Sequence, residues 1–248
     1  ADLAAAAHAA GATIDVFVEI DVGARRCGVA PGEEAVRLAQ AIAAAPPLRF
    51  AGLHAYHGSA QHLRTVAERS AAIAHAAAEA QRTRDLIERA GLACPLVTGA
   101  GTGSFAFEAA SRVYGELQPG SYVFMDADYA RNDWEGLPRF AHSLFILTTV
   151  MSAPVPERVV VDAGLKAHSI DSGMPLVHGR PGLAYAKASD EHGVVNVASG
   201  VARPALGDKL RLVPGHCDPT VNLYDWIVGA SGGRVEAVWP VAARGAFY

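Results

Sequence analysis

Lysine is scarce in this 248-residue sequence. It occurs only at Lys166, Lys187 and Lys209, and arginine supplies the other basic side chains. A reaction that needs a lysine in the first half of the protein cannot be performed by this chain alone. Cysteine is also rare, and its three widely spaced occurrences exclude a disulfide framework and fit a reducing cytosol. The sequence therefore predicts a cytoplasmic protein.

Long apolar runs and an excess of positive charge are absent as well. No apolar run reaches the roughly 18 residues of a membrane span, and the N-terminus lacks the basic start of a signal peptide. The formal net charge is −4 and there is no basic stripe, so neither a membrane nor nucleic acid is expected as a partner. With 51% hydrophobic and 19% charged residues, the composition is that of a globular protein with one large α/β domain or one domain plus a smaller one.

Short strands alternate with helices up to about residue 130. We expect strands at 14–20, 50–56, 95–98 and 115–117, and helices at 2–10, 31–45, 64–90 and 104–111. Polar, glycine-bearing loops follow the strands, as is typical of a parallel sheet with helices outside it. A closed barrel needs about 250 residues, so this pattern predicts part of a TIM-type β/α barrel, with a small open α/β sheet as the alternative. Because the opening helix follows no strand, we expect the sequence to be the C-terminal part of a longer protein.

After residue 140 the pattern changes to short β-like segments separated by proline and glycine. These segments are 143–153, 157–161, 182–187, 194–197, 209–213 and 234–239. They predict a mostly antiparallel β domain. We place the boundary near residues 130–142, which divides the chain into 1–135 and 136–248 and leaves open a return of the chain end to the barrel.

The sharpest local feature is PGHCDPT at 214–220. In an extended segment residues i and i+2 point the same way, so His216 and Asp218 are expected to face one side and Cys217 the other. Nitrogen and oxygen ligands suit manganese, zinc, magnesium or a similar divalent metal, whereas a cysteine ligand would indicate a softer zinc site. The alternative interpretation is a surface turn that begins at the Asp-Pro pair.

Two loops after the first strands carry candidate side chains. In the loop at 21–29 at most one member of the Arg25–Arg26 pair is expected to point inward, where an arginine can hold a phenolate or carboxylate oxygen. A solvated arginine pair is the alternative. The run at 54–62 contains Tyr56, His57 and His62, which are candidates for proton transfer. His54 lies inside the predicted strand, and we expect it to be a core histidine.

Two glycine loops follow the later strands, at 98–104 and 117–122. Backbone N–H groups in such loops can hold a phosphate. The first loop has neither the lysine of a P-loop nor the spacing of a dinucleotide-binding fingerprint. Two consecutive loops of this kind match the phosphate site that barrels build near their last strands.

In this order, the features resemble the fold type III pyridoxal 5'-phosphate (PLP) enzymes, the alanine racemase-like barrels. Within them, the sequence is most similar to the branch of D-threonine aldolases and D-serine dehydratases. The matching runs are DVGARRCGV at 21–29, AYHGSAQH at 55–62, TGAGTGS at 98–104, ELQPGSYVFMD at 116–126, VVVDAGLKAHSIDSG at 159–173, SDEHG at 189–193 and PGHCDPTVNLYD at 214–225. His216-Cys217-Asp218 favours the aldolases, because dehydratases of this type carry His-x-Cys.

The resemblance implies an enzyme that uses PLP and a divalent metal, with manganese preferred over magnesium, cobalt or zinc. It implies cleavage of D-threonine or a related D-β-hydroxy-α-amino acid to glycine and an aldehyde, and a homodimer. The alternatives are a D-serine or D-3-hydroxyaspartate dehydratase or aldolase of the same fold, a non-catalytic PLP-binding fragment, and a structural module.

The resemblance also implies roles for individual residues. His62, Arg26 and Tyr56 would be catalytic, and His216 and Asp218 would bind the metal. The implied PLP-binding residues are Arg26, Tyr56, Thr98, Gly101, Thr102, Gly120, Ser121 and Tyr122. Gln118 stands where alanine racemases have an arginine facing the pyridine nitrogen, which removes a fixed cation. The family's Schiff-base lysine lies on the first barrel strand, and all three lysines here lie in the predicted β domain, so that lysine is expected outside this sequence.

Overall fold

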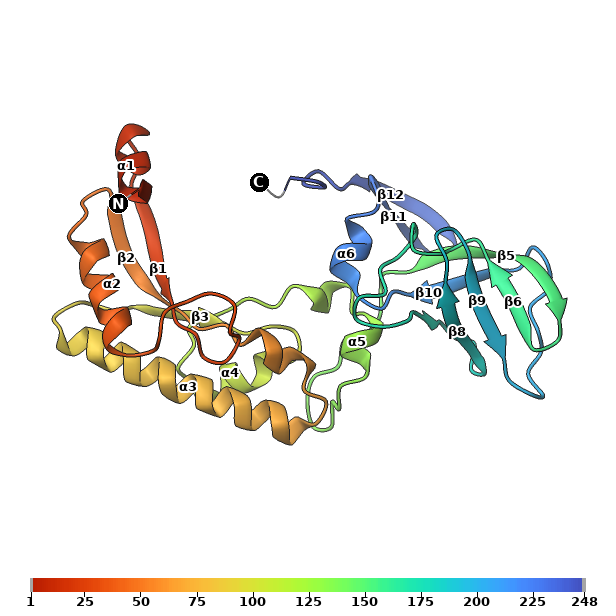
Figure 1. The fold of residues 1–248 in the computed structure, drawn as a ribbon, viewed down its shortest axis with the longest axis horizontal. Helices are drawn as coiled ribbons and strands as arrows, with labels where there is room; N and C mark the ends of the chain where they lie inside the picture. Colours follow the sequence, from red (N-terminus) through yellow and green to blue (C-terminus); the bar gives the residue numbers. More distant parts are fainter. Residues whose placement is uncertain (1, 247–248) are drawn as a thin grey trace. The chain divides into compact units, whose positions relative to one another are not determined.

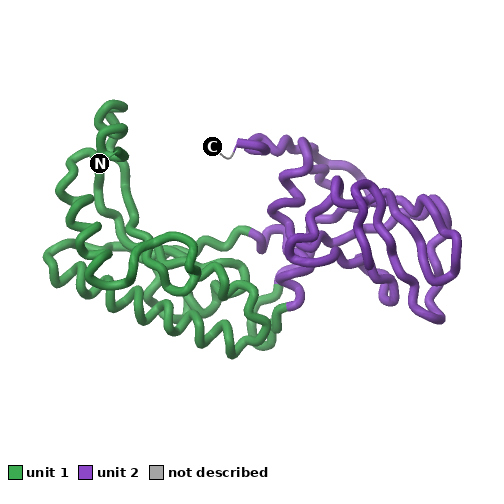
Figure 2. The backbone as a smooth tube through the Cα atoms, in the orientation of Figure 1, with its two compact units in different colours: residues 1–120, 132–139 green, residues 121–131, 140–248 purple. Residues whose placement is uncertain are grey.

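The computed structural model describes residues 2–246, which form two compact units (Figure 2). Unit 1 runs up to Gly120 and also includes Asn132–Arg139. Unit 2 comprises Ser121–Arg131 and the residues from Phe140 onward. The chain therefore crosses between the units at 120/121, 131/132 and 139/140, and the predicted single boundary after residue 135 falls inside the segment that returns to unit 1.

Unit 1 alternates helices and strands along the chain (Figure 1). Its elements are α1 (Asp2–Ala9), β1 (Ile14–Glu19), α2 (Glu33–Ala43), β2 (Leu48–His54), the 3-10 helix η1 (Gly58–His62), α3 (Val66–Arg89), β3 (Leu96–Gly99), α4 (Phe105–Ser111) and β4 (Glu116–Leu117). The strands form one parallel sheet in the order β1-β2-β3-β4. Chain order and sheet order coincide, as in a β/α barrel, which confirms the predicted α/β architecture.

Alternating apolar side chains on the strands and small side chains on the helices form the core of unit 1. Val18, Leu53 and Val97 from the sheet belong to one buried cluster with Ala39 of α2 and Ala80 of α3. At these buried positions alanine lets the helices approach the sheet closely. Because the sheet is parallel, the loops after β1, β2, β3 and β4 all leave from its carboxyl edge.

A glycine in β2 is required by the close approach of β3. Gly52 follows a bulge in the β1–β2 pairing and has φ 143°, and a Cβ there would clash with the carbonyl oxygen of Leu96. We expect Gly52→Ala to lower the free energy of unfolding by about 3 kcal/mol, because the new methyl group must separate β2 from β3. Urea unfolding measures the loss. Gly91→Ala is the control, since Gly91 has φ 85° but no atom lies within 4 Å of an added Cβ; equal losses in both variants would contradict the steric explanation.

Unit 2 is built mainly from short antiparallel strands. Its elements are η2 (Ser121–Val123), α5 (Ala127–Ala130), β5 (Ile146–Val155), β6 (Arg158–Val161), β7 (Leu176–Val177), β8 (Leu183–Ala188), β9 (Gly193–Val197), β10 (Lys209–Val213), α6 (Cys217–Val221), β11 (Trp226–Ser231) and β12 (Arg234–Pro240). Six strands form a sheet in the order β7-β10-β5-β6-β9-β8, and β11 and β12 form a hairpin. The predicted antiparallel β domain is confirmed.

The sheet of unit 2 has its own core, to which Ile146, Val159, Val195 and Leu212 contribute. The sequence did not predict the short elements α5, α6, β7 and β11. The chain end up to residue 246 belongs to unit 2. Within those residues, no helix combines the length and hydrophobicity needed to cross a membrane.

Candidate functional site

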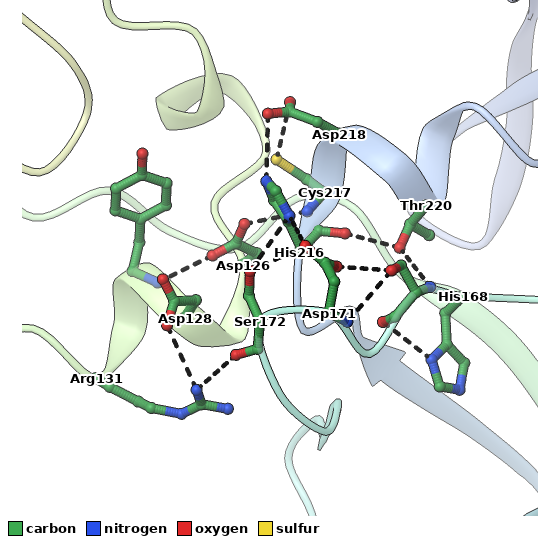
Figure 3. Close-up of polar contacts among 12 residues, drawn as sticks. Asp126, Asp128, Arg131, His168, Asp171, Ser172, His216, Cys217, Asp218 and Thr220 are labelled. Atoms are coloured by element: carbon green, nitrogen blue, oxygen red, sulfur yellow. Dashed lines mark hydrogen bonds and ion pairs between the residues drawn. The ribbon is translucent and has the colours of Figure 1, made fainter. Parts of the chain in front are cut away.

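His216 and Asp218 lie side by side in unit 2 (Figure 3). His216 Nε2 is 3.4 Å from Asp218 Oδ2. The prediction of an extended segment is wrong beyond His216. This residue is the N-cap of α6, with φ −144° and ψ 125°, and Asp218 lies in the first turn of that helix. The turn of the helix, and not the alternation of a strand, brings the carboxylate back to the imidazole.

A second carboxylate holds the other side of the same imidazole (Figure 3). His216 Nδ1 is 2.7 Å from Asp171 Oδ2 and 3.3 Å from Ser172 Oγ. The Ser169 hydroxyl in turn donates to Asp171 Oδ1 at 2.6 Å. A carboxylate on one ring nitrogen fixes the orientation of the ring and directs the other nitrogen, here Nε2, toward a ligand. Sequence reasoning did not single out Asp171, although it lies in the matching run at 159–173.

The charges of this cluster are strongly coupled. The hydrogen bond to Asp218, followed by the contact with Asp171, raises the pKa of His216 to about 9. The same contact with His216 lowers the pKa of Asp218. Partial burial would raise the pKa of Asp171, but hydrogen bonds from Ser169 and His216 outweigh it and lower that pKa to about 2. At neutral pH two ionised carboxylates therefore flank one imidazolium, which gives the cluster a net negative charge that attracts a cation. A metal ion bound at Nε2 would displace the proton from that nitrogen.

Cys217 points into the protein and is 1% exposed. Burial raises the pKa of its thiol to about 12, so it remains protonated and is poorly suited to bind a metal. Its side chain forms a hydrogen bond with Ser121, one of the residues implied for the phosphate site. Unit 2 therefore brings one implied PLP residue into contact with the loop that carries His216 and Asp218.

Asp126 holds this loop in place from the N-terminus of α5. Its carboxylate is fully buried and accepts hydrogen bonds from the backbone N–H of Cys217, at 3.1 Å, and from that of Tyr129, at 2.9 Å. The backbone N–H groups of Ala127 and Asp128 donate to the carbonyl groups of Pro214 and Gly215. The segment 126–128 therefore fixes both the chain before His216 and the first residue of α6.

The pair of side chains suits a divalent cation. Imidazole nitrogen and carboxylate oxygen each bind such metals at about 2.0–2.2 Å, and two atoms 3.4 Å apart can both lie at that distance from one ion. Among residues 2–246 no group of three or more histidine, cysteine, aspartate or glutamate side chains is arranged to hold a metal. His216 and Asp218 would therefore form an open site, in which water or substrate supplies the other ligands.

In unit 1, Arg26 and Tyr56 meet at the carboxyl edge of the sheet. The guanidinium carbon of Arg26 lies 5.4 Å from the centre of the Tyr56 ring, which stacks on His54. The Asp21 carboxylate shapes this loop by accepting from the backbone N–H groups of Gly23 and Arg25. Of the Arg25–Arg26 pair, Arg26 is the one placed over the aromatic ring.

His57 and His62 occupy different environments. His57 is half-buried: its ring lies against Gly23, where a Cβ would be 2.5 Å from Nε2, and its Nδ1 is 3.3 Å from Ser59 Oγ. Burial lowers the pKa of His57, which keeps it neutral at pH 7 and suits a role in joining two loops. His62 ends η1 and is exposed, which leaves it the better placed of the two for proton transfer with a ligand.

Thr98 and Gln118 belong to a chain of hydrogen bonds across the ends of the strands. The Thr98 hydroxyl donates to Glu116 Oε1 at 2.6 Å and accepts from Gln118 Nε2 at 2.9 Å. Gln118 Oε1 is 3.0 Å from His54 Nε2. The prediction that His54 is a core histidine is wrong, because His54 is only partly buried and takes part in this chain of hydrogen bonds. The structure gives no support for Thr98 as a phosphate ligand, since its hydroxyl already has two partners in the protein.

The two glycine loops have different surroundings. Gly101 and Thr102 are buried in the loop after β3, where the carbonyl group of Gly101 accepts from the N–H groups of Ser104 and Phe105. At Gly120, no atom would lie within 4 Å of an added Cβ. Gly120 is the last residue of this part of unit 1, and Ser121 and Tyr122, which follow it, belong to unit 2. Gly120 is exposed, whereas residues 98–104 are all buried. Backbone N–H groups of glycine loops are suited to hold a phosphate group.

Glu108 of α4 lies buried behind the first glycine loop and accepts a hydrogen bond from the Ser104 hydroxyl. Burial raises the pKa of Glu108 from 4.5 to about 7. A carboxyl group with a raised pKa in the folded state opposes folding once it ionises, so its penalty grows from pH 4.5 to about pH 7 and is constant above. We expect the free energy of unfolding of Glu108→Gln, relative to that of the parent protein, to rise by about 3 kcal/mol between about pH 4.5 and pH 8. Urea unfolding at both pH values measures it, and a difference that does not change with pH would contradict the buried ionisation.

Comparisons with family models match both units. The model "Alanine racemase, N-terminal domain" matches residues 1–128. The model "Putative serine dehydratase domain" matches residues 143–230. The chain belongs to the alanine racemase-like family, the fold type III group of PLP enzymes.

Individual relatives are aldolases of this family. The chain is 53% identical over 253 residues to 3-hydroxy-D-aspartate aldolase from Paracoccus denitrificans (strain Pd 1222), with 100% of this chain and 65% of the relative covered. It is 52% identical over 236 residues to D-threonine aldolase from Arthrobacter sp, with 95% of this chain and 62% of the relative covered. The crystal structure of D-threonine aldolase from Filomicrobium marinum matches with a TM-score of 0.96 and 52% identity, and the match covers 100% of this chain and 67% of that one. The chain thus spans less than two thirds of the length of either curated relative.

Proposed function

We propose that this chain forms the larger part of a PLP- and divalent-metal-dependent aldolase, which cleaves D-threonine or a related D-β-hydroxy-α-amino acid to glycine and an aldehyde. The observation that carries the proposal is the pair His216 and Asp218, 3.4 Å apart and oriented by Asp171. The similarity to D-threonine and 3-hydroxy-D-aspartate aldolases supports the same substrate class.

The residues at the carboxyl edge of unit 1 would hold the cofactor. Arg26 would donate hydrogen bonds to its phenolic oxygen, and Tyr56 would lie beside its ring. The backbone groups of the loop at 98–104 would hold its phosphate, and the family resemblance adds Gly120, Ser121 and Tyr122 to the same role. When bound, PLP supplies an electron sink for the charge left at Cα when a bond to that carbon breaks.

The remaining residues would act on the substrate hydroxyl. His216 Nε2 and Asp218 would hold a divalent cation, manganese by preference, with magnesium, cobalt or zinc as alternatives; such an ion lowers the pKa of a bound hydroxyl. His62 would take the proton from the β-hydroxyl. As the Cα–Cβ bond breaks, the β-carbon becomes the carbonyl carbon of the aldehyde, and Cα takes up a proton to give glycine.

The lysine that would bind PLP covalently is proposed to lie outside this chain. Lys166, Lys187 and Lys209 all belong to unit 2, where Lys166 pairs with Glu191 and Lys209 donates to Thr149. A homodimer and a cytoplasmic location are further proposals that rest on the family resemblance and on the scarcity of cysteine.

A product assay tests the function. The complete gene product, supplied with PLP and manganese, is incubated with D-threonine and with D-3-hydroxyaspartate, with L-threonine as the control. We expect glycine and an aldehyde from the D-substrates, and loss of this activity after treatment with a chelator. Formation of a keto acid and ammonia would instead establish a dehydratase, the second candidate, which the match of residues 143–230 favours.

A non-catalytic PLP-binding role gives a different result. Borohydride reduction followed by peptide mapping would then find no lysine linked to the cofactor, and neither product pair would form. Absence of PLP absorbance altogether would leave only the structural alternative.

A further inference from the structure

The side chain of Gln61 lies buried between two loops of unit 1 that carry implied site residues. It is 1% exposed and belongs to η1, directly before His62. Its Oε1 accepts from the backbone N–H of Gly103 at 2.8 Å, and its Nε2 donates to Ser104 Oγ at 2.7 Å. Nε2 also lies 3.3 Å from the carbonyl oxygen of His57. One amide group therefore contacts both the turn that carries His62 and the glycine loop after β3.

The glycines of this loop are shaped around Gln61. A Cβ on Gly101 would lie 2.5 Å from Gln61 Oε1, and a Cβ on Gly103 would lie 2.6 Å from the Gln61 carbonyl oxygen. Any larger residue at either position would push the loop away from η1. The glycine requirement at these two positions thus arises from contact with Gln61.

The hydrogen bonds that link Gly103, Gln61, Ser104 and Glu108 all run from donor to acceptor in the same direction. Gly103 N–H donates to Gln61, Gln61 donates to Ser104, and the Ser104 hydroxyl donates to Glu108 Oε1 at 2.7 Å. An amide is suited to the middle position, because it presents an acceptor and a donor on one rigid plane. Chains of buried hydrogen bonds of this kind rigidify the groups that they join.

The backbone of Gln61 is held as well. Its carbonyl oxygen accepts from Asn132 Nδ2 at 2.9 Å, and Asn132 Oδ1 accepts from Arg64 at 2.7 Å. Asn132 belongs to the segment 132–139 that returns to unit 1. The residue that precedes His62 is therefore fixed through both its side chain and its main chain.

We propose that Gln61 is a positioning residue that couples the phosphate-binding glycine loop to the turn bearing His62. This inference rests on the proposed PLP function. It predicts that loss of the amide weakens the hold on the phosphate group of the cofactor more than the hold on its ring, and that both loops loosen together.

The test compares PLP with pyridoxal, which lacks the phosphate, on the complete apo-protein. We expect Gln61→Met to weaken PLP binding about tenfold or more, as fits the loss of buried hydrogen bonds, and pyridoxal binding by less than about twofold on the same basis. Ser104→Ala, which removes one link and little volume, should give a smaller loss with the same preference for PLP. Gln40→Met on α2 changes an exposed glutamine and should alter neither affinity.

Hydrogen–deuterium exchange gives a second readout that needs no cofactor. In Gln61→Met, peptides covering 57–62 and 99–104 should both exchange faster, while those of α3 stay unchanged. Equal weakening of PLP and pyridoxal, or faster exchange in only one of the loops, would overturn the proposal. A parent protein that binds no PLP would refute the proposed function, and the exchange experiment would still decide whether Gln61 couples the two loops.

Discussion

Replacing His216 or Asp218 by alanine is expected to lower kcat/KM for cleavage of D-threonine by about 10³-fold or more, because a bound metal contributes several kcal/mol of charge stabilisation at the reacting oxygen. The structure places the two side chains 3.4 Å apart, so removal of either leaves a single ligand from the pair. Absorbance of bound PLP should persist in both variants, since neither His216 nor Asp218 is among the proposed PLP-binding residues. Steady-state assays of the complete gene product with excess manganese measure the loss.

The matched controls are His75→Ala and Asp85→Ala. Both side chains are exposed on α3, and neither belongs to a proposed site. They should retain the parent activity. If His216→Ala and Asp218→Ala cleaved D-threonine at the parent rate after removal of metal, these residues would have no part in binding a catalytic ion.

The second large effect is expected at Asp126, which touches neither substrate nor metal in the proposed site. Asp126→Ala leaves the buried N–H groups of Cys217 and Tyr129 without their acceptor. We expect a loss of about 3 kcal/mol in the free energy of unfolding, because an unsatisfied buried donor costs about 1–3 kcal/mol. We also expect manganese affinity to fall about tenfold, since displaced supporting groups weaken metal sites by roughly 10–100-fold. Urea unfolding and manganese titration measure the two effects.

Asp225→Ala is the control for Asp126→Ala, because it removes a carboxylate of unit 2 whose partner is exposed. Asp225 pairs with Arg244 at the surface, and such a pair contributes about 1 kcal/mol or less. Asp126→Asn retains one acceptor and should fall between the parent and the alanine variant. Unchanged manganese affinity in Asp126→Ala would show that α6 keeps His216 in place without the bridge to α5.

Much of the fold could be predicted because its signals are local. The strands β1 and β3 contain β-branched residues, β2 is mostly apolar, and polar loops end all three; α3 starts with a capping box formed by Thr65 and Glu68. The short elements α5 and α6 were missed because four or five residues carry too little periodicity, and the Asp-Pro pair in α6 resembles a turn. The single predicted boundary was too simple because no composition change marks the return of residues 132–139 to unit 1.

The supporting residues of the site could not be predicted in the same way. Asp171 is 45 residues from His216, Asp126 is 91 residues from Cys217, and Gln61 is 42 residues from Gly103. Each lies inside a run that resembles the family, yet nothing in its immediate neighbours distinguishes it from a solvated polar residue. Their roles arise from hydrogen bonds between segments that only folding brings together.

By itself, the sequence determined which residue types are available and which local structures they favour: the parallel α/β part, the antiparallel part, the glycine loops and the His-x-Asp pair. Only the tertiary structure decided that α6 turns Asp218 toward His216, that Asp171 and Asp126 hold this pair in place, and that Gln61 joins two loops. The physical reason is that helix and strand preferences act over a few neighbouring residues, whereas burial and hydrogen bonding act between any groups that packing brings within about 3 Å.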